Sequence, residues 1–384
     1  MAANDPAATT AAWLARIPVS ERVAAQAATD WRLFAWAAGW LIAIGACVVI
    51  SRAGLPRRIR QRLETGQPRP WLVNATIAGA MALILSVTNA VVSGVGDWQA
   101  DRLLHGAGAS GVAAHLALAA SGIALTTLAA AVLSPPAYWL MLRWPRTWPA
   151  ILGPALAALI LGLGWLPYAL SAGSDLGPAP PGPVRDSLQR LLVASGLPTR
   201  DVFVSYGPAF DGDVTGAFGH AKVTVGPGLL AGPPAEARAY VGHLMGHYAH
   251  SDILIVCLVL AAVIFFGLIA VQQLTSPLAR RIGAGLSPVT PDPEAMPAAT
   301  IIALLSVLVA GLAASAYLRW ANVRADEYSL NYAREPDGLA AVIEREWDHQ
   351  AVDPSPPETA VFYTHPPLVA RVRHAMDWKA AHGG

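Results

Sequence analysis

Six apolar runs without Asp, Glu, Lys or Arg constrain the fold of this chain more than any other feature. Each run is long enough to cross the roughly 30 Å hydrocarbon core of a bilayer as a helix. The runs cover residues 33–50, 71–95, 112–133, 149–170, 253–274 and 298–318. The composition agrees, because 54% of the residues are hydrophobic and 13% are charged, whereas soluble proteins carry about 25% charged residues. We therefore expect an α-helical multi-pass membrane protein with about six transmembrane helices.

The loops between these runs predict an orientation. Residues 51–70 carry six arginines and one glutamate, so the positive-inside rule places this loop in the cytoplasm. Counting six passes then places residues 171–252 and the C-terminal segment on the opposite face. We expect an integral protein of a bacterial inner membrane with these two segments on the periplasmic face. A net charge of +1 offers no basic surface, so we expect the lipid bilayer as a partner and no nucleic acid.

Two histidines, His243 and His247, stand four residues apart just before the fifth apolar run. On a helix this spacing places both side chains on one face, which suits one metal ion. In the zinc-hydrolase pattern H-E-x-x-H, the Glu after the first His is the general base, but this chain has Leu244 there. Taken alone the pair is ambiguous, since helical histidines satisfied by carbonyls or water show the same spacing. Asp252, which follows shortly after, is interpreted as marking the membrane boundary.

Motifs further along the chain give the histidine pair a context. After the sixth run the chain reads R-W-A-N-V-R-A-D over residues 319–326, and later T-H-P-P over residues 364–367, followed by Arg371. This order of parts resembles the membrane zinc metalloproteases of the CAAX prenyl endopeptidase and HtpX type. The resemblance runs from about residue 201 to the C-terminus. It implies a small α/β zincin-like (gluzincin-type) domain and zinc as the cofactor.

The resemblance also implies roles for residues at the metal. His243 and His247 match the first two zinc ligands, and Asn322 stands where the family has its third ligand, a Glu. Asp326 matches the acid that supports a ligating histidine from behind. Because Asn322 is neutral, we expect zinc to bind weakly if it binds at all, and a protein without metal is the alternative.

The remaining roles concern the reaction itself. His365 and Arg371 match a His and an Arg on the oxyanion side of a peptide-hydrolysis intermediate. Leu244 occupies the general-base position, so the base is missing, and loss of a positioned base typically lowers a rate by about 10² to 10⁴. The two departures from the family pattern, Leu244 and Asn322, both remove a carboxylate.

The predicted order of segments places the zincin-like domain in two separated parts of the chain. The five predicted segments are an N-terminal lead (1–32), a four-helix transmembrane region (33–170), a first zincin-like segment (171–252), a transmembrane hairpin (253–318) and a C-terminal zincin-like segment (319–384). Apolar spacing predicts an amphipathic helix over 185–195 and short strands over 201–206 and 221–225.

One of these strands is a candidate binding element. Lys222, Val223, Thr224 and Val225 are expected to lie beside the histidine helix and to pair with an extended peptide by main-chain hydrogen bonds. An ordinary sheet edge without a ligand is an equally weighted interpretation.

Three functions stay open. The favoured hypothesis is a catalytically degenerate pseudoprotease that binds a peptide or membrane-protein segment. One alternative is an active zinc-dependent membrane metalloendopeptidase in which His365, Asp326 or Glu327 supplies a missing role. The other is a multi-pass transporter or scaffold that keeps only the fold. The resemblance favours a cytosolic site, because CAAX-processing enzymes face the cytosol, whereas the loop charges favour the periplasmic side.

Overall fold

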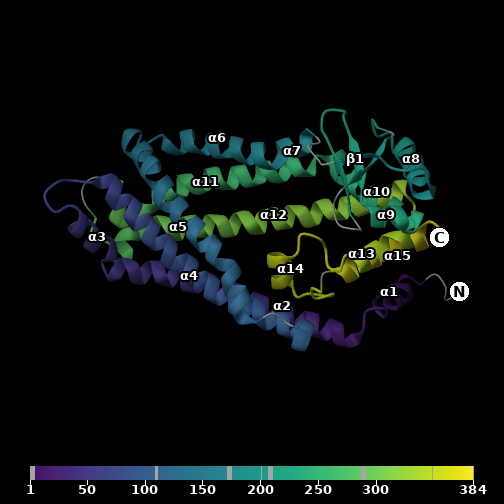
Figure 1. Cartoon of the computed structure of the whole chain (residues 1–384), viewed down its shortest axis with the longest axis horizontal. Coiled ribbons are helices and arrows are strands. Elements are labelled where there is room, and N and C mark those ends of the chain that lie inside the picture. Colours follow the sequence, from purple (N-terminus) through teal and green to yellow (C-terminus); the bar gives the residue numbers. More distant parts are fainter. Residues whose placement is uncertain are drawn as a thin grey trace. The chain divides into compact units, whose positions relative to one another are not determined.

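The described part of the chain is mostly helical and contains one small sheet (Figure 1). The computed structural model describes residues 5–108, 111–170, 175–199, 201–205, 211–286, 291–347 and 349–383. Before the sheet lie α1 (Pro6–Leu14), α2 (Val19–Arg52), α3 (Leu55–Leu63), α4 (Pro70–His105), η2 (Gly106–Gly108), α5 (Val112–Arg143), α6 (Trp148–Ile160), the π-helical turn η3 (Leu161–Trp165) and α7 (Leu166–Ala169).

The later helices alternate with and follow the strands. They are α8 (Pro183–Ser195), α9 (Pro227–Ala231), α10 (Pro234–His250), α11 (Asp252–Arg281), η4 (Pro293–Ala295), α12 (Met296–Tyr332), α13 (Pro336–Arg345), α14 (Pro356–Phe362) and α15 (Leu368–Ala381).

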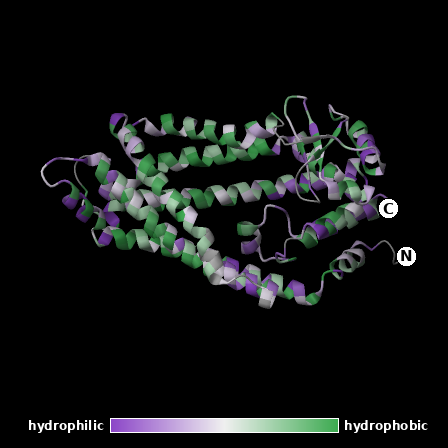
Figure 2. Cartoon of the chain, viewed as in Figure 1, coloured by the Kyte–Doolittle hydropathy of each residue, from purple (hydrophilic) through white to green (hydrophobic). Residues whose placement is uncertain are grey.

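Six helical segments of the described chain are long and apolar enough to span a membrane, which confirms the predicted number. They are Val19–Arg52, Pro70–His105, Ala119–Arg143, Trp148–Ala169, Asp252–Arg281 and Pro293–Tyr332. Apolar residues line long stretches of these helices (Figure 2). Large apolar side chains on them are exposed, with Leu41 at 71% and Leu163 at 73%. An exposed apolar surface of this kind is suited to lipid.

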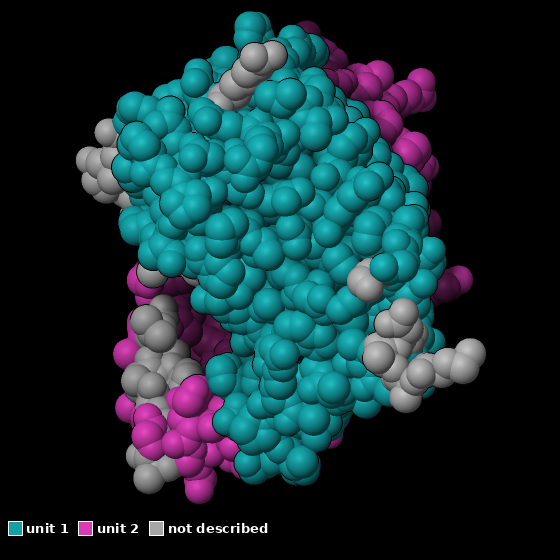
Figure 3. All heavy atoms as spheres, turned by 90° about the vertical axis from the view of Figure 1, so that its right-hand side faces the viewer, with its two compact units in different colours: residues 1–26, 158–260, 312–384 teal, residues 27–157, 261–311 magenta. Residues whose placement is uncertain are grey.

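The helices and the sheet divide into two compact units (Figure 3). Unit 1 comprises residues 1–26, 158–260 and 312–384, and unit 2 comprises residues 27–157 and 261–311. Within unit 2, Arg60 of α3 forms ion pairs with Asp292 at 3.1 Å and Glu294 at 3.0 Å. Unit 1 contains the sheet and every residue that the sequence assigns to a functional site.

The sheet has four strands in the order β1-β2-β4-β3. These are β1 (Asp175–Pro178), β2 (Val202–Ser205), β3 (Gly212–Thr215) and β4 (Lys222–Val225). β2 and β4 run parallel, whereas β1 pairs with β2 and β3 pairs with β4 in antiparallel fashion. β2, β4 and α8 confirm the predicted strands and amphipathic helix, although Tyr206, in the first predicted strand, lies outside the described residues. The sequence does not predict β1, in which Gly177 and Pro178 interrupt the apolar alternation typical of strands, or β3, in which Val214 is the only apolar side chain.

The strand predicted to bind a peptide at the edge of the sheet lies inside the sheet, so this prediction is wrong. Lys222, Val223, Thr224 and Val225 form β4, which lies between β2 and β3 and pairs with both. Val223 and Val225 are fully buried in the core. The Lys222 Nζ lies 5.4 Å from the centroid of the Phe203 ring. A strand that is paired on both sides cannot accept another strand; among the described strands, β1 and β3 are the outer ones.

The core of unit 1 forms where α8, α9 and α10 pack against the sheet. Its buried side chains are Ala179, Val184, Leu188, Leu191, Leu192, Val202, Val214, Val223, Val225, Leu229, Ala237, Val241, Met245 and Ala333. This burial fixes α10 on the sheet, because removing apolar surface from water is the main stabilising contribution in such a core. The histidine helix is therefore held by the sheet on one side.

On another side, α10 approaches α12 closely because two glycines lie in the contact. A Cβ on Gly246 would lie 2.7 Å from the Ala325 Cα, and a Cβ on Gly242 would lie 2.9 Å from the Ser329 Oγ. Real Cβ atoms do not come as close to a backbone atom as at Gly246, so a side chain there would push the two helices apart, and at Gly242 the Ser329 side chain would have to move. The contact brings the histidines of α10 next to the polar residues of α12.

We predict that Gly246→Ala lowers the thermal midpoint of the detergent-solubilised protein. Overpacking a tight contact typically costs about 1–3 kcal/mol, and here the added methyl meets the α12 backbone. Gly311→Ala, on α12, is the matched control, since nothing lies within 4 Å of its added Cβ. Equal midpoints for the two variants would contradict the proposed role of Gly246.

Candidate metal centre

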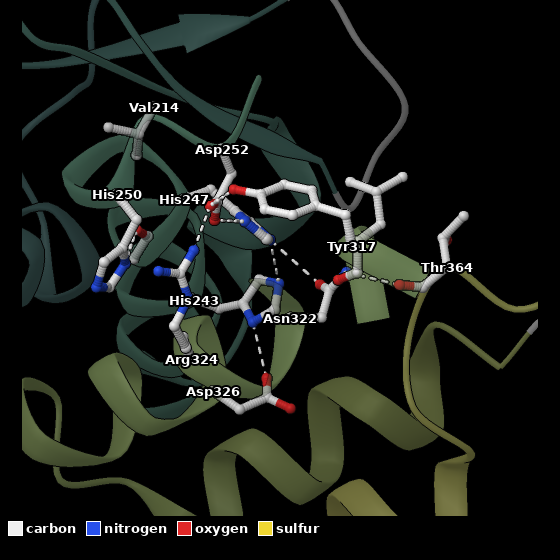
Figure 4. A network of polar contacts seen from close by, with 12 residues as sticks. Val214, His243, His247, His250, Asp252, Tyr317, Asn322, Arg324, Asp326 and Thr364 are labelled. Carbon is white, nitrogen blue, oxygen red and sulfur yellow. Dashed lines mark hydrogen bonds and ion pairs between the residues drawn. The ribbon is translucent and has the colours of Figure 1, made fainter. Parts of the chain in front are cut away.

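Three potential metal donors converge between α10 and α12 (Figure 4). The His243 Nε2 and His247 Nε2 are 3.2 Å apart, and the His247 Nε2 is 3.2 Å from the Asn322 Oδ1. The i and i+4 spacing on α10 produces the histidine pair, as the sequence predicts. α12 adds the third donor from a position 75 residues further along the chain.

A buried carboxylate orients each histidine. The His243 Nδ1 is 2.7 Å from the Asp326 Oδ1, and the His247 Nδ1 is 2.8 Å from the Asp252 Oδ2. Because an ionised carboxylate only accepts hydrogen bonds, each Nδ1 carries the proton and donates it. Each Nε2 then presents a lone pair, which is the arrangement that metal-binding histidines use.

The amide of Asn322 is oriented as well. Its Nδ2 donates to the Leu318 carbonyl at 2.9 Å and to the Thr364 carbonyl at 3.0 Å. The Oδ1 must therefore be the atom that faces the histidines, where it can only accept. Asn322 is 3% exposed, so the protein rather than solvent determines this orientation.

This donor set fits a cation better than a proton. Three acceptor atoms facing one another repel unless a positive charge lies among them. A second proton on His243 is disfavoured, because burial and the nearby positive charge of Arg371 lower the pKa of its imidazole, although Asp326 acts in the opposite direction. Ligand atoms about 2.0–2.1 Å from a tetrahedral zinc lie roughly 3.3 Å from one another, close to the 3.2 Å found here. The His247 Nε2 thus lies at the spacing of zinc ligands from both the His243 Nε2 and the Asn322 Oδ1.

The third potential donor is the amide of Asn322 rather than a carboxylate, a thiolate or a third histidine. No group of three or more His, Cys, Asp or Glu side chains within the described residues is placed to hold a metal. Asn322 is neutral, so the three donors leave the full charge of a divalent ion uncompensated. Zinc sites generally use stronger third ligands, and we expect the affinity to be lower than with a Glu.

Arg371 holds the carboxylate behind His243. Its Nε donates to the Asp326 Oδ2 at 2.8 Å and its Nη2 donates to the Asp326 Oδ1 at 2.7 Å. Arg371 is 7% exposed and Asp326 is 1% exposed. Such bidentate pairs are strong and geometrically specific. Two of the guanidinium nitrogens are engaged in this way, and an oxyanion role for Arg371 stays a prediction.

Asp252 is a site residue that the sequence analysis missed. Ser251 alone separates α10 from α11, and its φ of 55° turns the chain so that the Asp252 carboxylate returns to His247. The carboxylate is fully buried and accepts from the Tyr317 hydroxyl and the Arg324 Nη2, both at 2.6 Å. The only signal in the sequence is an acid that follows the second histidine by five residues.

Two cavities of unit 1 meet at the metal donors. The larger has a volume of about 550 Å³ and the smaller about 220 Å³. Leu244, His247, Thr364 and His365 line both. Leu244 therefore stands in the groove that these cavities form, at the position expected for a general base.

The other predicted residues fall into two groups. The His365 ring stacks near His243, with the ring centroids 6.1 Å apart and the planes 24° apart, so it belongs to the site. Glu327, a possible replacement acid, is exposed on α12. Lys222 to Val225 line neither of the two cavities.

Taken together, a membrane-embedded helical chain with a small sheet, and a histidine pair backed by carboxylates, define a zincin-like membrane protein. Comparison with protein families matches residues 178–379 to peptidase family M48. This match covers more than half of the chain, so the chain belongs to peptidase family M48, which confirms the predicted resemblance to membrane zinc metalloproteases. This chain is similar in structure to the crystal structure of Ste24p from S. mikatae, with a TM-score of 0.47 and 15% sequence identity. The aligned region covers 88% of this chain and 99% of the Ste24p chain. No curated protein matches the chain.

We predict that Asp326→Asn strongly destabilises the protein. Breaking a buried ion pair typically costs about 3–5 kcal/mol, since it leaves an uncompensated buried charge, here on Arg371. Asp377→Asn is the matched control, because the pair of Asp377 with Arg373 is exposed, at 50% and 46%, and exposed pairs contribute about 0–1 kcal/mol. Thermal midpoints of both variants in detergent test this, and a mild effect of Asp326→Asn would contradict it.

Proposed function

We propose that this protein is a non-hydrolysing member of family M48 that binds a peptide or membrane-protein segment in the groove beside its metal donors. The observation that carries the proposal is Leu244, which lines both cavities at the general-base position. Leucine has no atom that can take a proton from water. A positioned proton acceptor typically contributes about 10² to 10⁴ to the rate of hydrolysis, so the groove is better suited to binding than to cutting.

His243, His247 and Asn322 would hold zinc in this protein. Zinc bound there would act as a Lewis acid that polarises a carbonyl oxygen. With three neutral donors the ion is held less tightly than in a site with a carboxylate ligand. The chain's own contribution is to keep both imidazoles in the ligating tautomer through Asp252 and Asp326.

Several side chains that line the groove are available to contact a bound segment. They include Tyr240, Ile343, Trp347, Gln350, Phe362, Tyr363 and Leu368 in the larger cavity. Strand addition is less well supported, because at the outer strand β3 the Val214 carbonyl already accepts a hydrogen bond from the Tyr168 hydroxyl at 2.8 Å. Recognition by side chains therefore supports the proposal better than pairing with the sheet.

One observation favours the alternative of an active metalloendopeptidase. Glu346 lines the larger cavity together with His243 and His247, so it offers a carboxylate to the same cavity as the two histidines. The other candidates are less suitable: Asp326 is engaged by Arg371 and His243, and Glu327 is exposed on α12.

The proposed location is a bacterial inner membrane with the metal site on the periplasmic face. The ion pairs of Arg60 with Asp292 and Glu294 support placing the loop after the first span and the loop after the fifth span on one side. The bond from the Gln272 Nε2 to the Pro145 carbonyl, at 2.8 Å, supports the same side for the loop after the third span. Arginines gather in these loops, which favours the cytoplasmic side for them.

We predict that Leu244→Glu/Asn322→Glu gains peptidase activity that the native protein lacks. The two substitutions restore a general base and a charged ligand, and a positioned base is typically worth about 10² to 10⁴ in rate. The assay follows cleavage and binding of fluorescein-labelled casein by purified protein supplied with zinc. Elemental mass spectrometry after dialysis against a weak chelator measures retained zinc, which we expect to be higher in the double variant.

The native protein should bind the labelled casein without cutting it, and Leu244→Trp, which fills the groove, should weaken binding. Val193→Trp is the control, because Val193 is 56% exposed on α8. Native cleavage at the rate of the double variant would overturn the proposal, and its loss in Glu346→Gln would then identify Glu346 as the replacement base. Absence of casein binding would favour a transporter or scaffold.

We predict that the exposed face of α8 is periplasmic. Val193→Cys in a Cys47→Ala/Cys257→Ala background should react with a membrane-impermeant maleimide in spheroplasts. Gln67→Cys, at an exposed position in the arginine-rich loop, should react only after lysis. The reverse pattern would place the metal site in the cytoplasm.

A further inference from the structure

Phe218, at the tip of the β3–β4 hairpin, combines exposure with a strained backbone. Its side chain is 86% exposed, and its φ of 54° lies in the left-handed region. Bulky residues seldom adopt this region, and such strain persists only where surrounding contacts enforce it, often at functional positions. An exposed aromatic ring held in this way requires a physical explanation.

Hydrogen bonds on both sides of Phe218 hold the tip in place. The Gly216 N–H donates to the Tyr168 carbonyl at 2.8 Å, so the tip is tied to α7. On the other side, the Tyr248 hydroxyl donates to the His220 carbonyl at 2.9 Å, which ties the tip to α10. The Tyr168 hydroxyl adds a bond to the Val214 carbonyl at 2.8 Å. The hairpin is thus fixed beside the end of the fourth membrane span, where Figure 1 draws α7 next to the sheet.

The ring of Phe218 meets the span itself. It contacts Trp165 edge to face, with the ring centroids 5.8 Å apart and the planes 84° apart. Trp165 lies four residues before Ala169, the last residue of the span, which is about 6 Å along a helix that rises 1.5 Å per residue. Tryptophan at this depth is typical of the membrane interface. Phe218 therefore contacts the end of a helical segment that is long and apolar enough to span a membrane.

The tip is uncharged, and the helical segment that it contacts carries exposed apolar side chains. Leu163 and Leu166 lie in the fourth span and Leu170 directly follows it; they are 73%, 43% and 68% exposed. Residues 214–221 contain no Asp, Glu, Lys or Arg, so no charge has to leave water when the tip enters lipid. A hydrophobic side chain beside such a surface is stabilised by burial in lipid rather than by water.

We propose that the β3–β4 hairpin tip, with Phe218 at its apex, inserts into the bilayer interface and anchors the sheet of unit 1 to the membrane. The partner is the lipid bilayer, recognised by an apolar ring next to an interfacial tryptophan. This anchor differs from the spanning helices, because the hairpin would enter the interface and return to the same side of the membrane without crossing it. It does not depend on whether the groove binds or cuts peptides.

The anchor has one consequence, which rests on the proposed function. It holds β3 at the membrane surface, and Asp213 and Val214 of β3 line the smaller cavity together with Leu244. A polypeptide segment that leaves the bilayer at this face then has a short path into the groove.

Spin labelling in liposomes tests the proposal on the full-length protein. Phe218→Cys is prepared in the Cys47→Ala/Cys257→Ala background, labelled with a nitroxide and reconstituted in phosphatidylethanolamine/phosphatidylglycerol vesicles. The accessibility of the nitroxide is measured from the relaxation of its electron spin in the presence of two reagents. Oxygen concentrates in lipid, and nickel ethylenediaminediacetate stays in water. Leu163→Cys on the span is the lipid reference and Val193→Cys on α8 is the water reference.

We expect the ratio of oxygen to nickel accessibility at position 218 to shift from the value at 193 towards the value at 163. A ratio equal to that at 193 would overturn the proposal, since the tip would then lie in water. Low accessibility to both reagents would also overturn it, because a protein partner or a second copy would then cover the ring. Ala217→Cys repeats the measurement at a neighbouring position in case Phe218→Cys fails to fold.

Discussion

The buried carboxylate of Asp326 is the interaction on which the rest of the site depends. It accepts hydrogen bonds from His243 on α10 and from Arg371 on α15, and it is itself part of α12. A buried charge is stable only when it is paired and hydrogen-bonded. These three helices therefore meet at one point, and the orientation of the first histidine follows from the same contacts that hold the fold together.

The second histidine of the site is oriented in the same way. Asp252 likewise joins His247 to Tyr317 and Arg324 through one buried carboxylate. Removing either acid would leave a charged partner in a poorly solvated place, which is strongly destabilising. Leu244 and Asn322, by contrast, carry no charge, and both line the smaller cavity beside His247.

The position of the site in the chain links it to the membrane. Asn322 and Asp326 lie in the last turns of the sixth span, and Asp252 is the first residue of the fifth. The donors are thus fixed to elements that the bilayer orients. The groove between them is lined by side chains from α10, from α12 and from the segment before α15.

The sequence by itself determined the membrane class, the six spans, the histidine pair and the family, because long apolar runs and an i, i+4 spacing are local properties of the chain. It did not reveal that Asp252 supports His247, since that contact depends on a left-handed residue at Ser251. It also placed the binding edge on the wrong strand, because strand order in a sheet follows from long-range pairing and β3, rich in polar residues, showed no strand pattern. Only the tertiary structure decided which acceptor atoms face one another, because the close approach of α10 and α12 at Gly242 and Gly246 brings together residues far apart in the chain.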